Sequence, residues 1–239
     1  MNTVTQNLAQ NDLLGALGRA DLDLIRPFLN HETRPSGDVL YHPGDDIGRV
    51  FFPLGSSQVS YAVNNIRGGP VQTLLVGREG GVGGIVSCGG LPAYCLISVS
   101  LGGSFLVADV GRVQSAKDSS EPLRRLFERY SDFLLAQIFQ ATACNAIHSV
   151  EQRAAKWILE EADRADAAVA HLSHEALALR LGVGRSYVTR VLRTFVADGV
   201  LDTSRGAIAI LDRSALEQKS CGCNRHVESH WDRVLGKIY

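Results

Sequence analysis

The amino-acid sequence predicts an α+β protein with three consecutive parts: an N-terminal antiparallel β-roll (jelly roll), a long helix, and a C-terminal winged helix-turn-helix. Between residues 31 and 113, glycine is frequent and short apolar runs alternate with turn signals, which is typical of antiparallel sheets. Residues 120–148 carry apolar side chains at alternating spacings of four and three, the pattern of one long amphipathic helix. Residues 172–201 hold two short amphipathic segments around Gly182, and a predicted hairpin follows them.

The composition is that of an ordinary folded chain. Its 239 residues, 45% of them hydrophobic and 21% charged, are enough for one or two domains. The net charge is −1, so any surface for nucleic acid must come from local clustering of cations. Without an apolar N-terminal leader or an apolar run of membrane-spanning length, we expect a cytoplasmic protein with no membrane contact.

The cysteines are dispersed and odd in number, which favours reduced thiols over a disulfide framework. They are Cys88, Cys95, Cys144, Cys221 and Cys223. The last two form a Cys-x-Cys pair in the tail, with His226 and His230 nearby. These residue types can ligate metal, but the usual zinc spacing is Cys-x₂-Cys, so we predict no metal and no cofactor.

The N-terminal part begins with a predicted helix over residues 11–29, and Pro27 indicates a boundary near its end. Short predicted strands follow to about residue 113. No His-x-His pair of the kind that binds catalytic metal occurs in this β-roll, and the chain has no P-loop, dinucleotide fingerprint or local Ser-His-Asp signature. We therefore predict that the protein is not an enzyme.

The long helix presents one apolar stripe, and its spacing suits a two-helix coiled coil. We expect this stripe to be the seam of a homodimer. The alternative is a helix packed on its own sheet; in the dimer, the flanking Leu126, Phe133, Ile138 and Ile147 would cover that sheet instead. The seam residues are Leu123, Phe127, Tyr130, Leu134, Gln137, Ala141 and Cys144.

The C-terminal part centres on two short helices. Ser173 is a plausible N-cap for the first, over about residues 174–181, and Gly182 provides the positive φ for a sharp turn. The second helix is expected over about residues 185–196. Its apolar side consists of Val188, Val191, Leu192 and Phe195.

The other side of the second helix is cationic and rich in hydrogen-bonding groups, with no acidic residue, which suits the major groove of DNA. Residues 202–212 predict a hairpin turning at Arg205 and Gly206, a wing that brings Arg205 to phosphate. We expect double-stranded DNA to be contacted by Arg185, Ser186, Tyr187, Thr189, Arg190 and Arg205.

The order of these parts resembles the CRP/FNR family of bacterial transcription regulators over nearly the whole chain. The likeness is strongest in residues 172–201, where family pattern positions are occupied by Ala178, Gly182, Val188, Arg190 and Leu192. Residues 76–84 (VGREGGVGG), residues 144–159 (CNAIHSVEQRAAKWIL) and the Cys-x-Cys tail resemble one subgroup, whose effectors are mostly unassigned.

The resemblance implies a homodimeric regulator on a near-palindromic operator, with RNA polymerase as a further partner if it activates transcription. The implied domains are residues 11–118 for sensing, 119–149 for dimerisation and 150–239 for DNA binding. Ser186 stands where many family members have a glutamate that accepts from cytosine. The half-site therefore need not be the family's commonest one.

The resemblance also locates a candidate effector pocket in the β-roll. In cyclic-nucleotide-binding relatives a glutamate holds the ribose and an arginine holds the cyclic phosphate; here Gly84 and Tyr94 fall near those positions. No basic residue lies between Glu79 and Arg112, and a buried phosphate without a cation is costly. We expect cyclic AMP not to bind tightly, and the effector is unknown. The pocket candidates are Glu79, Gly80, Gly83, Gly84, Tyr94 and Cys95.

Two alternatives remain open at the level of the sequence. One is a constitutive regulator whose β-roll is only a scaffold or a protein-interaction face. The other is a thiol- or metal-responsive regulator that uses Cys221 and Cys223.

Overall fold

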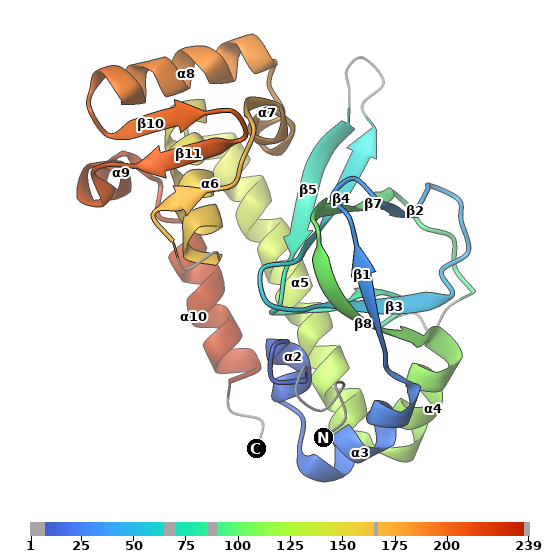
Figure 1. The fold of residues 1–239 in the computed structure, drawn as a ribbon. Helices are drawn as coiled ribbons and strands as arrows, with labels where there is room; N and C mark the ends of the chain where they lie inside the picture. The colour runs from blue at the N-terminus through green and yellow to red at the C-terminus, as the bar shows by residue number, and fades with distance from the viewer. Residues whose placement is uncertain (1–7, 65–69, 86–89, 165–166, 237–239) are drawn as a thin grey trace. The chain divides into compact units, whose positions relative to one another are not determined.

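The computed structural model describes residues 8–64, 70–85, 90–164 and 167–236, and the chain forms two compact units (Figure 1). The first unit consists of Met1–Asn64, Leu74–Ala136 and His230–Tyr239, and the second of Asn65–Thr73 and Gln137–Ser229. Helix α5 (Glu121–Ile147) belongs to both. The fold is α+β, as predicted: antiparallel sheets, then a long helix, then a helix-turn-helix with wing strands. Cys88 lies outside the described residues.

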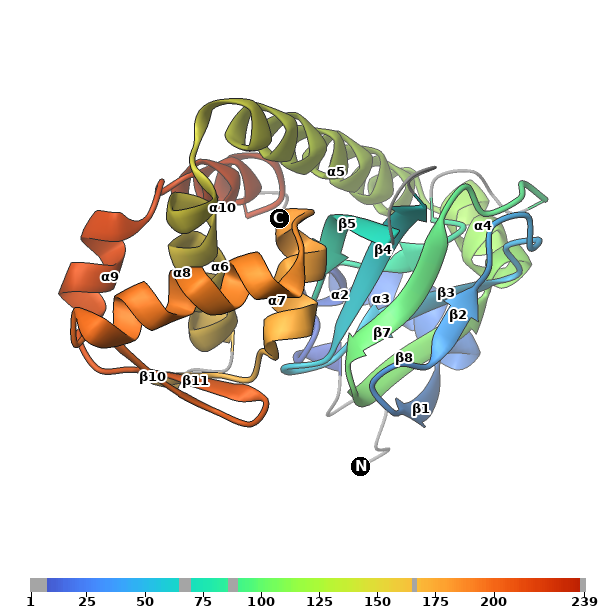
Figure 2. The same cartoon turned by 90° about the horizontal axis from the view of Figure 1, so that it is seen from above.

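Two four-stranded antiparallel sheets form the β-roll (Figure 2). The first sheet has the order β1 (Asn30–Arg34), β8 (Gly103–Asp109), β3 (Arg49–Pro53) and β6 (Val82–Gly83). The second has the order β2 (Val39–Tyr41), β7 (Leu96–Leu101), β4 (Gln58–Asn64) and β5 (Pro70–Val76). Phe51 and Phe105 of the first sheet and Val59 and Ile97 of the second belong to one hydrophobic cluster, so the sheets are the two layers of a sandwich.

The predicted N-terminal helix is broken into short pieces. They are α2 (Asp12–Gly15), α3 (Arg19–Ile25) and the 3₁₀ turn η1 (Arg26–Phe28). Gly18 causes the break, since its extended backbone forms the N-cap of α3. Asn11 is fully buried and caps α2 by accepting from the Leu14 N–H at 2.9 Å. Its amide also donates to the carbonyls of Pro53 and Gly80, at 2.9 and 2.8 Å.

Short helices cover the outer face of the first sheet. Helix α4 (Val110–Ser119) starts at an Asp109 cap and packs on β8 and β3, while α3 packs on α4 and η1 touches β8. Leu106 and Ala108, which alternate with the inward-facing residues of β8, are accordingly buried as well.

The second unit contains the helix-turn-helix. Its elements after α5 are α6 (Val150–Arg164), β9 (Val169–Ala170), α7 (His174–Leu181), α8 (Arg185–Ala197), β10 (Leu201–Ser204), β11 (Ala207–Ile210), α9 (Arg213–Lys219) and the start of α10 (Asn224–Val234). The two predicted helices are confirmed within one residue, and the wing hairpin, predicted over residues 202–212, is confirmed within two. Helices α6, α7 and α8 share one core with Leu201 and Ile208 of the wing. No helix among the described residues is long and apolar enough to cross a bilayer.

The predicted dimer seam needs correction. Leu123, Phe127 and Tyr130 are at most 1% exposed within one chain, and Leu134 packs against the sheet core. Cys144 is also 1% exposed and lies beside a sulfur of the tail. Spacings of four and three mark any face that a long helix buries, whether against a partner or its own domain. Here the buried stripe packs mainly inside the protomer; of the seven seam residues, Leu134, Gln137 and Ala141 are half-buried and the others are buried.

A different face of α5 is open. Leu135, Ile138, Phe139 and Ile147 are 49%, 41%, 68% and 76% exposed. Ile138 and Phe139 follow Leu135 by three and four residues, so these three share one helix face, and Ile147 lies further round at the helix end. Of the residues expected on the sheet, Leu126 and Phe133 are buried, whereas Ile138 and Ile147 are not. We call Leu135, Ile138, Phe139 and Ile147 the open stripe.

Candidate nucleic-acid interface

The turn between α7 and α8 is set by local chemistry. The Ser173 hydroxyl accepts from the Ala176 N–H at 3.1 Å and caps α7, as the sequence predicts. Gly182 has φ +67°, a left-handed conformation that closes the helix and that other residues adopt at a cost. The apolar sides of both helices, including Leu177 and Val188, are buried in the unit's core.

The outward face of α8 carries the predicted reading residues. Arg185, Ser186 and Arg190 are exposed, and so is Arg193, one turn beyond Arg190. The N-cap residue is Gly184, and no side chain caps the first turn. No side chain therefore competes with an anion at this helix N-terminus, which is the usual place for a phosphate contact.

Tyr187 and Thr189, also predicted to touch DNA, have partners inside the protein. The Tyr187 hydroxyl donates to a carboxylate oxygen of Glu151 at 3.1 Å, and the Arg190 guanidinium lies 4.7 Å from the centre of its ring. The Thr189 hydroxyl is 3.1 Å from Nδ1 of His174. Both hydroxyls are therefore engaged within the protein and help to hold α8 against α6 and α7.

Two titratable groups beside this face, Glu151 and His174, have lowered pKa values. The pKa of Glu151 is lowered, first by a hydrogen bond to its own backbone and then by groups that include Tyr187 and Arg190, so it is an anion beside the reading helix. The pKa of His174 is lowered by burial and by the charge of Arg185, so its imidazole is neutral at pH 7. Neither group adds positive charge to the face.

A buried ion pair fixes α7 on α6. Nη1 of Arg180 is 2.8 Å from Oε2 of Glu161, and the two side chains are 4% and 3% exposed. The Arg180 guanidinium also lies 5.4 Å from the ring centre of Trp157. Sequence reasoning missed this pair, since nothing local links residues nineteen positions apart.

The wing places Arg205 as predicted. β10 and β11 pair in register up to Ser204 and Ala207, and Gly206 takes φ +80° at the turn. Arg205 is exposed at this tip. The strand β9 adds a third strand next to β11.

Two glycines of the candidate effector pocket, Gly80 and Gly83, stand where a side chain would clash with the surrounding protein. A Cβ on Gly80 would lie 2.0 Å from the Tyr130 hydroxyl, and a Cβ on Gly83 would lie 2.1 Å from the Arg49 carbonyl oxygen. The Gly80 N–H donates to the Gly77 carbonyl at 3.1 Å. Gly84 is buried. Close packing, of Gly80 against the Tyr130 side chain and of Gly83 against the Arg49 backbone, explains these two glycines without a bound phosphate.

The other pocket candidates, Glu79, Tyr94 and Cys95, differ in their contacts and in their exposure to solvent. The Glu79 carboxylate accepts from the Gly77 N–H at 3.0 Å and so closes a turn. Tyr94 is 85% exposed, while its neighbour Cys95 is buried in the core of the sandwich, where burial raises the pKa of the thiol. The sequence did not reveal Lys117, which is buried and whose Nζ donates to the Ile85 carbonyl at 2.8 Å.

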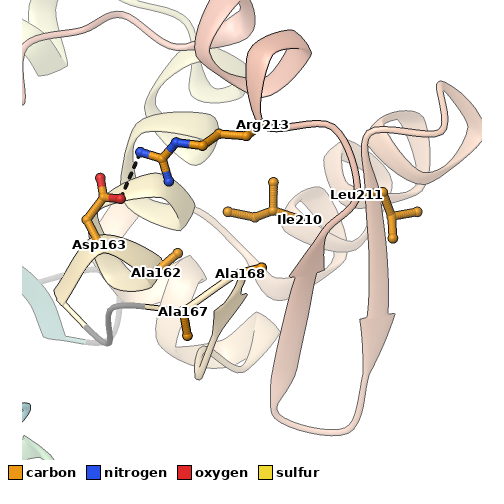
Figure 3. Close-up of a pocket in the computed structure, with 7 residues that line it drawn as sticks. All are labelled: Ala162, Asp163, Ala167, Ala168, Ile210, Leu211 and Arg213. Carbon is orange, nitrogen blue, oxygen red and sulfur yellow. Dashed lines mark ion pairs between the residues drawn. The ribbon is translucent and has the colours of Figure 1, made fainter.

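A hollow on the second unit is lined by residues of α6, β11 and α9 and of the loops beside them (Figure 3). An ion pair of 2.8 Å between Arg213 and Asp163 stands at its edge. It is lined by Ala162, Asp163, Ala167, Ala168, Ile210, Leu211 and Arg213. This lining offers little beyond alanines and a satisfied ion pair, so we assign it no role.

Four metal-ligating side chains meet in the second unit. Sγ of Cys144 is 3.7 Å from Sγ of Cys221, and Sγ of Cys223 is 3.6 Å from Nδ1 of His148. One ligand atom from each lies within 4.8 Å of every other. The sequence pattern points only to the tail, where His226 and His230 follow the Cys-x-Cys pair, because Cys144 and His148 are more than seventy positions away. Their spacing of four on a helical turn was the available signal.

Two thiols of this cluster, Cys144 and Cys223, have pKa values above that of free cysteine. Burial raises the pKa of Cys144, although the nearby Lys156 opposes the shift. Burial and the neighbouring thiols raise the pKa of Cys223 to about 12. Nζ of Lys156 lies 3.8 Å from the Cys144 sulfur and 4.4 Å from the ring centre of Trp157.

Solved structures of regulators share this fold. FixK2 of Bradyrhizobium japonicum superposes with a TM-score of 0.70 over 81% of this chain and 98% of that one. CLP of Xanthomonas campestris, described as a c-di-GMP-responsive global regulator, gives 0.68 over 82% and 100%. A CRP-family regulator of Thermus thermophilus gives 0.68 over 79% and 96%. Each is 15% identical to this chain.

Sequence comparison identifies the DNA-binding part. Residues 152–219 match the family described as the Crp-like helix-turn-helix domain, which spans α6 to α9. No curated protein matches the chain by sequence. The chain therefore carries a DNA-binding domain of the Crp-like helix-turn-helix family, within a fold that it shares with solved CRP-family regulators.

Proposed function

We propose that this protein is a cytoplasmic, homodimeric regulator that reads a near-palindromic operator with α8. The observation that carries the proposal is the face of α8 itself: exposed Arg185, Ser186 and Arg190 stand above a first turn that no side chain caps. Arginine can bind guanine O6 and N7 in a bidentate manner. Two such helices in a dimer are expected about 34–36 Å apart, on successive major grooves.

The partner copy is proposed to cover the open stripe of α5. Four large apolar side chains are exposed on one helix, and three of them, Leu135, Ile138 and Phe139, share one face of the kind that a second helix buries. The seam therefore moves from the predicted residues to Leu135, Ile138, Phe139 and Ile147. If the regulator activates transcription, RNA polymerase is a further partner.

The switch is proposed to be a rotation of the DNA-binding domains about residues 145–150, biased from the β-roll. The proposal keeps the domains 11–118, 119–149 and 150–239. The competing possibility is a constitutive regulator with a scaffold β-roll, which is supported by the structural duties of Gly80 and Gly83. Selecting bound DNA from a random pool, with and without a small-molecule cell extract, tests both: an extract that never changes operator affinity supports the scaffold.

Replacing Arg190 with alanine is expected to weaken operator binding by about 1–3 kcal/mol and to relax preference at one base pair. The reason is the loss of a guanidinium that can grip a base edge, since Tyr187 below it stays tied to Glu151. Affinity is measured by gel-shift titration on the selected operator at fixed salt, because phosphate contacts make it strongly salt-dependent. Unchanged affinity would rule out Arg190 as a reader. Arg213→Ala, on α9, is the matched control.

Cyclic AMP is expected not to bind at micromolar concentration or below. No basic residue lies between Glu79 and Arg112, and the buried ammonium of Lys117 already donates to Ile85. Isothermal calorimetry with cyclic AMP, and with c-di-GMP as a second ligand, measures this directly. Micromolar or tighter binding of cyclic AMP would contradict the expectation, and Lys117→Met would then show whether that ammonium supplies the cation.

A further inference from the structure

The cluster in the second unit has the composition of a metal site. It offers three cysteine sulfurs and one imidazole nitrogen, from the last turn of α5 (Cys144), the residue after it (His148) and the loop between α9 and α10 (Cys221 and Cys223). Gly222 takes φ +64° between the two tail cysteines, a left-handed turn within the Cys-x-Cys pair. Two segments that are distant in sequence, the end of α5 and the α9–α10 loop, thus bring these ligands to one place.

The spacing of these atoms fits a single tetrahedral ion. Zn–S bonds of about 2.3 Å and Zn–N bonds of about 2.0–2.1 Å put neighbouring sulfurs about 3.8 Å apart, and a sulfur and a nitrogen about 3.6 Å apart. The corresponding separations here are 3.7 Å for Cys144 and Cys221, and 3.6 Å for Cys223 and His148. A set of ligand atoms all within 4.8 Å encloses one ion and leaves no space for a multi-iron cluster.

The surroundings complement a charged site. Three thiolates around Zn²⁺ leave a net charge of −1, and the buried ammonium of Lys156 lies 3.8 Å from the Cys144 sulfur. No described carboxylate forms a salt bridge with Lys156 in the structure, so the thiolate would be its natural counter-charge. Cations next to ligand sulfurs stabilise the thiolate form.

We propose that Cys144, His148, Cys221 and Cys223 bind one Zn²⁺ ion. The ion would cross-link the end of α5 to the α9–α10 loop, inside the unit that carries the helix-turn-helix. The site does not depend on which operator the protein reads or on what the β-roll senses. The proposed site assigns Cys144 and His148 as ligands, which the Cys-x-Cys pair alone does not indicate.

Metal binding is tested on the full chain, purified under reducing conditions and stripped with a chelator. Zn²⁺ is expected to bind with a stoichiometry of one per chain and to raise the unfolding temperature. Co²⁺ in its place should give the strong visible bands of a tetrahedral ion together with thiolate charge-transfer absorption. A stripped, reduced protein that takes up no stoichiometric Zn²⁺, or Co²⁺ spectra without thiolate absorption, would overturn the proposal.

Variants identify the ligands. Cys144→Ser and Cys221→Ser should each lose stoichiometric zinc, whereas Cys95→Ser, which removes a buried thiol of the β-roll, should keep it. His148→Cys should retain the metal and shift the cobalt spectrum towards four sulfur ligands, which a merely structural histidine would not do. Lys156→Met should weaken zinc affinity about 10- to 100-fold. Full zinc binding by Cys144→Ser, or a Cys144–Cys221 disulfide in protein isolated without oxygen, would count against the site.

Discussion

Replacing Glu161 with glutamine is expected to lower the free energy of unfolding by about 3–5 kcal/mol. The pair it forms with Arg180 is 3% and 4% exposed, so the change leaves a guanidinium charge in a place where water cannot solvate it. The neighbouring Trp157 ring offers a weaker contact that does not replace a carboxylate. Because Arg180 belongs to the first helix of the helix-turn-helix, the loss is expected to loosen α7 on α6 and to reduce operator binding as well.

Urea unfolding measures the change in the free energy of unfolding caused by Glu161→Gln. All variants are compared at one protein concentration, since the stability of a dimer depends on concentration. The control is Glu121→Gln, which breaks an ion pair whose side chains are 58% and 65% exposed and is expected to cost about 0–1 kcal/mol. The double replacement Glu161→Leu with Arg180→Met should recover most of the loss, because it removes both charges. A single change that costs no more than the control would show that the pair is not desolvated in solution.

Replacing Phe139 with aspartate is expected to separate the dimer and to abolish operator binding at working concentrations. Phe139 is 68% exposed in one chain and is the largest side chain of the open stripe. Burying it contributes about 1.5–3 kcal/mol per copy, and a two-fold interface loses it twice. The dimer dissociation constant should therefore rise by about two to four powers of ten.

Sedimentation equilibrium across a concentration series gives the dissociation constant. Leu211→Asp makes the same kind of change at a residue that is 63% exposed and lies outside α5, and it should leave the dimer intact. If Phe139→Asp remains dimeric down to nanomolar concentration, the open stripe is not the seam. In that case the contact between copies must use another surface.

The helix-turn-helix could be predicted closely because its signals are local. A capping serine, a glycine with positive φ and apolar spacing of three and four determine α7 and α8 within a few residues. The face of α5 could not be read in the same way. A buried stripe looks alike whether it meets a partner or its own sheet, and only the pairing of Tyr130 with the backbone of Gly81 shows which applies.

Contacts between distant parts of the chain account for the other differences. Cys144 and Cys221 are 77 positions apart, Glu161 and Arg180 are 19 apart, and Lys117 reaches Ile85 across 32. Such pairs form only because of the way strands and helices pack together, so they cannot be predicted from the local sequence around either residue. Gly80 and Gly83 illustrate the reverse error, since glycines that suggested a ligand loop are explained by tight packing.

Asn11 has a consequence for where the β-roll begins. Its amide satisfies two carbonyls, of Pro53 and Gly80, and the Asp12 N–H binds the Arg78 carbonyl at 2.7 Å. Leu8, three residues earlier, is only 6% exposed. A fragment that begins after Asn11 would leave the carbonyls of Pro53 and Gly80 without the donor that the Asn11 amide provides. An autonomous β-roll must therefore include the residues from Leu8 onwards, and its boundary lies upstream of the first residue that the helical pattern marks.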